Sequence, residues 1–180
     1  MKEQLVELIT LISSDSMADA DIQRIADEAS RAYADPQAFL AAHPEVDYDD
    51  SLPIPPGEWV LVSSLPDTVL FQAKQADELF QQVLDSFGSQ SPLTLKPADL
   101  AKDDLLTALQ RMQVQLSSLY PATEGYELVD FSEPLEQELQ VVLIYTRDLP
   151  RVLELSTELG IYAAPAYERR LEALGDGEDG

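Results

Sequence analysis

The residues whose types and spacing suit chemistry lie between positions 43 and 50. Carboxylate oxygens spaced along a loop, together with an imidazole, are ligands that divalent cations accept. The segment holds the single histidine of the chain and four acids: His43, Glu45, Asp47, Asp49 and Asp50. A divalent-metal site, or a metal-dependent hydrolase with His43 as ligand or base, is therefore one interpretation of this segment.

The same segment matches a calcium-binding loop only in part. Asp47-x-Asp49-x-Ser51, with Glu58 at the twelfth place, follows the alternation of oxygen ligands in an EF-hand. The sixth place holds Leu52 where the sharp turn requires glycine, and prolines follow it. An EF-hand is therefore not expected. The remaining alternatives are a looser divalent site and a solvated acidic loop, with His43 placed to interact with a helix C-terminus.

Motifs for other chemistry are missing from the sequence. The chain has no cysteine, which excludes a disulfide, a zinc-thiolate site and a thiol nucleophile. No Gly-x-Ser-x-Gly elbow, Walker A loop or dinucleotide fingerprint is present among its seven glycines. We therefore expect no cofactor, and a non-catalytic role is favoured over an enzyme.

Charge is the strongest signal in the composition. The chain has 34 acidic and 11 basic residues, and its formal net charge is −23. Positions 32–73 contain seven acids and no Lys or Arg, and positions 112–146 contain six acids and likewise no Lys or Arg. A field of this sign repels nucleic acids and anionic membranes and attracts basic proteins. Solubility alone is the other explanation for such a composition.

The elements around this segment begin with a helical layer over residues 1–44. Leu5, Leu8, Ile9 and Ile12 have helical spacing, a second helix starts near Asp19, and Asp35-Pro36 caps a third. An acidic, proline-rich connector with no regular structure is predicted over 45–57, because three prolines and a glycine fall within five residues. The apolar run at 59–65 is compatible with a helix or a strand.

Residues 58–174 are predicted to contain the sheet. Leu139 to Tyr145 is the longest apolar run and suits a central strand covered on both faces. A helix follows it, with Pro150 in the first turn and Gly160 at the C′ position. We predict an α+β fold with a small mixed sheet of about four strands, 68–72, 126–131, 139–146 and 161–164, the last joined to its predecessor by a parallel crossover. Helices pack on this sheet.

The domain organisation follows from length. A single domain over 1–174 and a disordered tail over 175–180 are expected. No apolar run reaches a membrane span and the start lacks a signal peptide, so a cytoplasmic location is predicted. Leucines and a methionine at 4-3-4-3 spacing over 105–119 suit either a core helix or a dimer seam. Both a monomer and a homodimer remain open.

Several short stretches together resemble a family of uncharacterised bacterial proteins of about this length. They are Asp35-Pro36-x-x-Phe39-Leu40, Trp59 near a short apolar run, Leu70-Phe71-x-x-Lys74 before Asp77-Glu78-Leu79, and Gly125-Tyr126-Glu127-Leu128. The resemblance covers most of the chain and implies a bacterial cytoplasmic domain of mixed α and β structure. It assigns no activity and no residue role. A non-catalytic interaction module with an acidic surface for a basic partner is the first functional hypothesis, as an inhibitor, an immunity-type protein or an adaptor.

Overall fold

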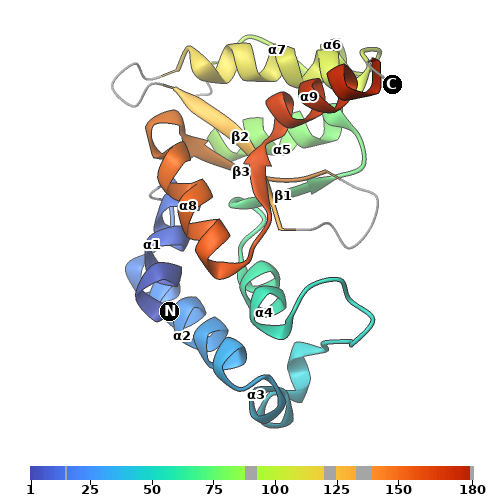
Figure 1. Ribbon diagram of the computed structural model, residues 1–180. Coiled ribbons are helices and arrows are strands. Elements are labelled where there is room, and N and C mark those ends of the chain that lie inside the picture. Colours follow the sequence, from blue (N-terminus) through green and yellow to red (C-terminus); the bar gives the residue numbers. More distant parts are fainter. Residues whose placement is uncertain (15, 88–92, 120–124, 133–138, 179–180) are drawn as a thin grey trace.

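A four-stranded sheet lies between two groups of helices in the computed structural model (Figure 1). The structure describes residues 1–14, 16–87, 93–119, 125–132 and 139–178. The strands are β1 (Leu70–Ala73), β2 (Tyr126–Phe131), β3 (Leu139–Tyr145) and β4 (Ala163–Pro165), in the spatial order β1-β3-β2-β4. The predicted α+β class is confirmed.

The sheet is antiparallel throughout the described residues, so the prediction of a mixed sheet was wrong. Val142 of β3 lies opposite Leu70 of β1 on one side and Val129 of β2 on the other. Pro165 of β4 also lies opposite Val129. Strands β3 and β4 therefore run in the same direction, but β2 lies between them, and the predicted crossover skips one strand. The two strands that it connects are parallel, as predicted, but they are not adjacent in the sheet.

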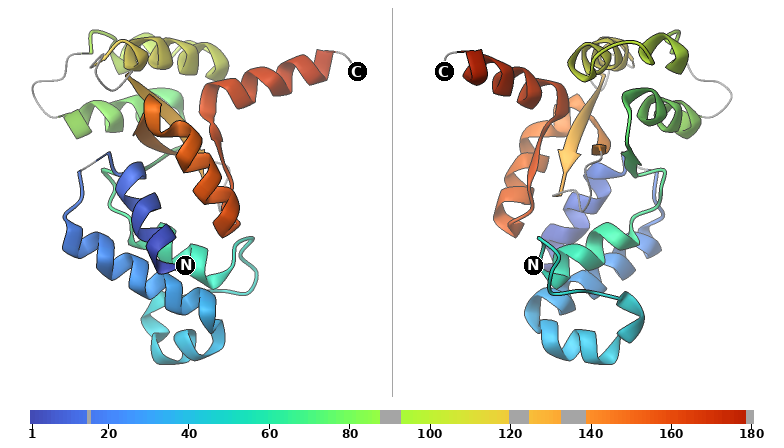
Figure 2. Two further views of the ribbon diagram at one scale, coloured as in Figure 1. Left: turned by 60° about the vertical axis from the view of Figure 1, so that its left-hand side comes forward. Right: turned by 90° about the vertical axis from the view of Figure 1, so that its right-hand side faces the viewer.

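One face of the sheet is covered by helices from both ends of the chain. These are α1 (Lys2–Ile12), α2 (Asp19–Ala34), α4 (Pro56–Ser64) and α8 (Leu149–Leu159), and α3 (Pro36–Ala42) packs on α2 and α4 at the end of this group away from the sheet. Their apolar side chains form one core cluster with Val142, Ile144, Val129 and Phe131 of the sheet. Arg151 of α8 binds Glu7 of α1 through two hydrogen bonds of 2.7 and 2.8 Å, which joins the two terminal parts of the chain. Figure 2 shows this group of helices from two further sides.

The opposite face is covered by α5 (Ala76–Phe87), α6 (Pro97–Leu100), α7 (Leu105–Ser117) and α9 (Ala166–Glu178). Side chains alternate along a strand, so Val141 and Leu143 point into this second cluster while their neighbours point into the first. Leu109, Met112 and Leu116 of α7 are buried against them. Three residues of the 4-3-4-3 spacing over 105–119 are therefore buried in the core and Leu119 packs against it, whereas Leu105 is 40% exposed.

Several boundaries differ from the predicted ones. The ambiguous run at 59–65 belongs to helix α4 as far as Ser64, and Leu65 is the C-cap. Strand β1 starts at Leu70 because the Pro66 carbonyl holds the N–H groups of residues 69 and 70 in a turn. The described residues also include two short 3-10 helices, η1 (Pro44–Val46) and η4 (Thr146–Asp148), and the first overlaps the start of the predicted connector. The tail predicted to be disordered is helical as far as Glu178. No described helix has the length and apolar character needed to cross a membrane.

Candidate functional site

The predicted site residues lie at the far end of the helical layer, between α3 and α4. The Asp35 carboxylate caps α3 by accepting the Ala38 N–H at 3.1 Å, and α3 ends at Ala42 with His43 as its C-cap. Pro44 then opens η1, and the chain continues to Asp50 through exposed carboxylates. We call residues 45–50 the acidic loop. Figure 1 shows it as part of a long connection that projects from the molecule.

His43 is engaged within its own segment. Its ring stacks on Phe39 with centroids 4.4 Å apart, and its Nδ1 lies 3.0 Å from Glu45 Oε1. The pKa of Glu45 is lowered by a hydrogen bond to the backbone of Glu45 itself and by the hydrogen bond to His43. The Glu45 side chain is nevertheless 69% exposed. The imidazole thus fixes the start of the acidic loop, and the carboxylate stays ionised in solvent.

The acidic loop is attached to the helical layer through side chains that the sequence patterns do not indicate. The indole Nε1 of Trp59, in α4, donates to the Val46 carbonyl at 2.9 Å. The Tyr48 hydroxyl donates to the Ile54 carbonyl at 2.9 Å, and the Ile54 side chain is only 4% exposed. Asp47 has a left-handed backbone conformation, with φ of 54°. These contacts hold an exposed loop in one conformation.

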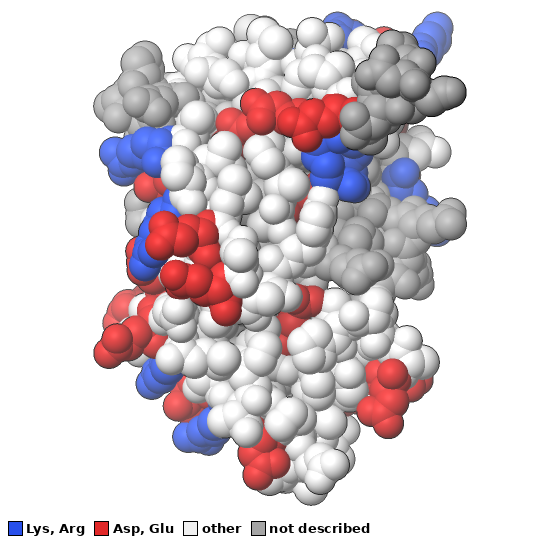
Figure 3. Space-filling model, in the orientation of Figure 1, with Lys and Arg blue, Asp and Glu red and all other residues white. Residues whose placement is uncertain are grey.

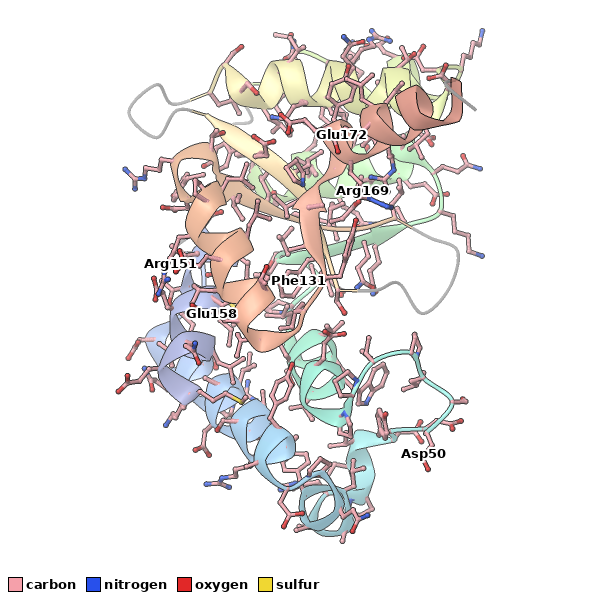
Figure 4. All side chains as sticks on the ribbon, viewed as in Figure 1. Asp50, Phe131, Arg151, Glu158, Arg169 and Glu172 are labelled. Atoms are coloured by element: carbon pink, nitrogen blue, oxygen red, sulfur yellow. The ribbon has the colours of Figure 1, made fainter. Side chains whose placement is uncertain are left out.

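The carboxylates of the acidic loop do not converge. Asp49 turns back to accept the Ser51 N–H at 2.9 Å, and the hydrogen bonds from Ser51 lower the pKa of this carboxyl group. Asp50 points away from the protein (Figure 4). Among the residues that the structure describes, no group of three or more His, Asp or Glu side chains is arranged to hold a metal ion. The geometry brings together only His43 and Glu45.

The Lys and Arg side chains form their ion pairs away from the acidic loop. Eight of the 11 Lys and Arg residues form nine ion pairs with described carboxylates, and none of these nine pairs involves the acidic loop. The contact of His43 with Glu45 is the one described pair in that loop. In the lower half of Figure 3, blue atoms appear on the left flank, whereas the right flank is red and white. The charge of the acidic loop is therefore uncompensated by any described Lys or Arg pair.

Residues 112–146, the second segment without Lys or Arg, do not form a comparable exposed acidic surface among the described residues. Glu124, Glu133, Glu136 and Glu138 lie outside the described residues. The two described acids, Glu127 and Asp130, are part of β2, and burial raises the pKa of both. They contribute little to an open acidic surface.

Sequence reasoning missed a buried ionic cluster at the start of α9. Asp130 is 5% exposed and accepts hydrogen bonds from Arg169 Nε at 2.8 Å and from Arg170 Nη1 at 2.9 Å. Arg169, labelled in Figure 4, also lies over the ring of Tyr162. The available signal was an acid within an apolar strand and the only adjacent pair of arginines in the chain. Because both arginines come from α9, the cluster fixes that helix to the sheet.

No family model matches the chain. No curated protein and no solved structure matches it either. The resemblance to uncharacterised bacterial proteins therefore stays a prediction, and the function is argued from the geometry alone.

The pH dependence of stability follows from these carboxyl groups. The pKa values of Glu7, Glu45 and Asp49 are lowered in the folded state, so their contributions are present above an unfolded pKa of about 4 and are lost as the pH falls below it. The pKa values of Glu127 and Asp130 are raised, so ionising them opposes folding at neutral pH. As the pH is lowered from 8 to about 5, we expect the thermal midpoint to rise, because repulsion between the acidic residues also weakens. When the pH is lowered further, below about 4, we expect the midpoint to fall. Melting curves at constant ionic strength test this, and a midpoint that falls steadily from pH 8 to pH 5 would contradict it.

Proposed function

We propose that this chain is a non-catalytic interaction module that presents its acidic loop to a basic protein, as an inhibitor, an immunity-type protein or an adaptor. One observation carries the proposal. Four carboxylates stand on an exposed, anchored loop, and no described Lys or Arg forms an ion pair with any of them.

The anchoring matters energetically because binding costs free energy when a loop must first be ordered. The bonds from Trp59 and Tyr48 to backbone carbonyls of this segment place that cost in folding. The uncompensated charge adds long-range attraction, which raises association rates with a cationic partner. An acidic loop with these two properties suits recognition of a basic surface.

The alternative is a divalent-metal protein or a metal-dependent hydrolase that uses residues 43–50. It has no comparable support, since the described carboxylates of this segment do not converge and His43 is held between Phe39 and Glu45. The interaction proposal is therefore the one to test first.

Removing charge from the acidic loop tests the proposal. The triple substitution Glu45→Gln, Asp47→Asn and Asp50→Asn keeps side-chain size and leaves the Asp49 bond to Ser51 in place. At roughly 0.5 kcal/mol per exposed charge, we expect it to weaken binding of a fluorescent decalysine peptide about tenfold. Fluorescence anisotropy at low salt measures the dissociation constant.

A matched triple substitution separates this surface from net charge. Glu3→Gln, Glu78→Gln and Glu172→Gln change the charge by the same amount at exposed positions on α1, α5 and α9. We expect a change of less than about threefold for this control. Equal weakening by both variants, or binding indifferent to added sodium chloride, would show that the peptide does not recognise the acidic loop.

A further inference from the structure

No described strand lies on the outer side of β1. β1 is the outer strand of the order β1-β3-β2-β4 and pairs with β3 alone among the described residues. The opposite outer strand, β4, is three residues long and ends in Pro165, which has no N–H to donate. At β1, by contrast, the Gln72 carbonyl accepts a hydrogen bond of 2.7 Å from the Gln82 side chain of α5, so a side chain bonds the backbone there. The Leu70 N–H is also held, by the Pro66 carbonyl, so an additional strand would displace the Gln82 side chain and pair with the remainder of this edge.

A groove runs along this edge between β1 and α5. Its volume is about 380 Å³, which falls within the range of ligand-binding pockets. It is lined by Leu70 and Gln72 of β1, by Gln82, Asp85 and Ser86 of α5, and by Asp67. Among the described residues, its lining thus contains two acidic residues and no Lys or Arg.

A smaller pocket continues from the groove. Thr68 and Ser86 line both hollows, which therefore border each other. The second has a volume of about 160 Å³, and among the described residues its lining contains five Ser or Thr residues and no charged residue; Asp15, between the lining residues Ser14 and Ser16, lies outside the described residues. Its apolar lining includes Val69, Phe71 and Leu143. A cavity of about 150 Å³ accommodates a benzene ring, so this pocket has the volume for one aromatic side chain, and its lining combines apolar and hydroxyl-bearing residues.

From this arrangement we infer that the β1 edge binds an extended, basic segment of a partner protein by strand addition. The segment pairs its backbone with β1, places one apolar or aromatic side chain in the smaller pocket, and places Lys or Arg beside Asp67 and Asp85. In strand addition the backbone supplies affinity, and pockets for alternate side chains supply specificity. A second copy of this chain is a poor occupant, because two such edges would bring like charges together. The inference rests on the proposed function only for the sign of the partner's charge.

The test uses the intact protein and the fluorescent peptide acetyl-KIFIK-amide, with acetyl-EIFIE-amide as its charge-reversed control. Ser86→Arg inserts a large side chain at the wall that both hollows share. Its matched control is Ser63→Arg in α4, because Ser63 and Ser86 are both exposed helical serines that bond the carbonyl three residues earlier. We expect Ser86→Arg to weaken binding of the basic peptide at least about tenfold, and Ser63→Arg to change it less than about twofold.

Backbone methylation of the peptide tests the binding mode directly. Alternate amides of a strand point to opposite edges, so N-methylation of one alternate set removes the bonds to β1 while N-methylation of the other set faces solvent. We expect only one of the two methylated peptides to lose binding. Equal binding of both methylated peptides, or equal effects of the two serine substitutions, would overturn the inference. A protein that sediments as a dimer and becomes a monomer on Ser86→Arg would also overturn it, by assigning the edge to a second copy.

The two proposals fail separately. The acidic-loop triple variant should leave binding of acetyl-KIFIK-amide within about twofold, because residues 45–50 do not line the groove. If that variant also leaves decalysine binding unchanged while Ser86→Arg abolishes peptide binding, the acidic-loop proposal fails and the strand-addition site stands. If instead the acidic-loop triple variant weakens decalysine binding and Ser86→Arg leaves binding of acetyl-KIFIK-amide unchanged, only the strand-addition site is rejected.

Discussion

Replacing both Arg169 and Arg170 with methionine is expected to lower the free energy of unfolding by about 3–5 kcal/mol, because Asp130 would be left as a buried charge without its partners. Asp130 is 5% exposed, and all of its described ion pairs come from these two residues. The two single variants should differ. Arg170 is 20% exposed and Arg169 is 45% exposed, so the more buried Arg170 should account for the larger part of the loss. Urea denaturation of the three variants measures these differences.

A rescue variant distinguishes a lost ion pair from lost packing. Adding Asp130→Leu to the double variant removes the stranded charge and fills the site with apolar volume, and such replacements of whole buried ion pairs are often neutral or stabilising. We therefore expect the triple variant to recover most of the stability of the double variant. If the triple variant were as unstable as the double variant, packing of the arginine side chains would explain the loss. A double variant within about 1 kcal/mol of the unmodified protein would show that water replaces the arginines.

Local sequence patterns predicted the elements whose signals are local. The buried run of β3 and the one-faced pattern of α5 are observed, and Gly160 has the positive φ, 74°, expected of a C′ residue. The run after Pro56 did contain a deciding signal, since a proline in the first turn favours a helix over a strand. Hydrophobicity alone did not separate the two.

Strand neighbours were not predictable in the same way. The last strand begins at Ala163 because the Ile161 N–H bonds back to Ser156 in α8 and the Tyr162 carbonyl accepts the Ser132 N–H. The first bond is local to the end of α8, whereas the second joins segments that are far apart in sequence, and no periodicity encodes it. The pairing of β4 with β2 is accompanied by the cluster of Asp130 with two arginines, which is likewise a tertiary feature.

The candidate site was likewise predictable from the sequence only in part. Exposed acids without nearby cations were visible in the composition of residues 45–50. Their fixed geometry depends on a bond between Trp59 and Val46, which lie 13 residues apart, and on burial of Ile54. The groove beside β1 depends on which strand is outermost, a property of the whole sheet. Sequence reasoning therefore located charge, and the structure supplied the surfaces that present it.

Gly125→Ala is expected to lower the free energy of unfolding by about 2–4 kcal/mol, because it adds a steric clash to a backbone penalty. Gly125 has φ of 83°, and a Cβ there would overlap the backbone of Ser117 at the end of α7. Gly160 provides a matched comparison, since its φ is 74° and a Cβ there would meet no atom within 4 Å. Gly160→Ala should therefore cost only the backbone penalty, about 1–2 kcal/mol. Denaturant unfolding of the two variants compares the costs.

The difference between the two glycines has a structural consequence for β2. The Gly125 carbonyl accepts the Thr146 N–H at 3.0 Å, just before β2 begins, so displacement of Gly125 also displaces the first residues of that strand. Tyr126 and Tyr145, whose ring centroids lie 5.3 Å apart, would then change their mutual orientation. We expect the near-ultraviolet circular dichroism of Gly125→Ala to change while that of Gly160→Ala does not. Equal stabilities for the two variants, with unchanged spectra, would mean that α7 shifts freely and that the contact with Ser117 does not position β2.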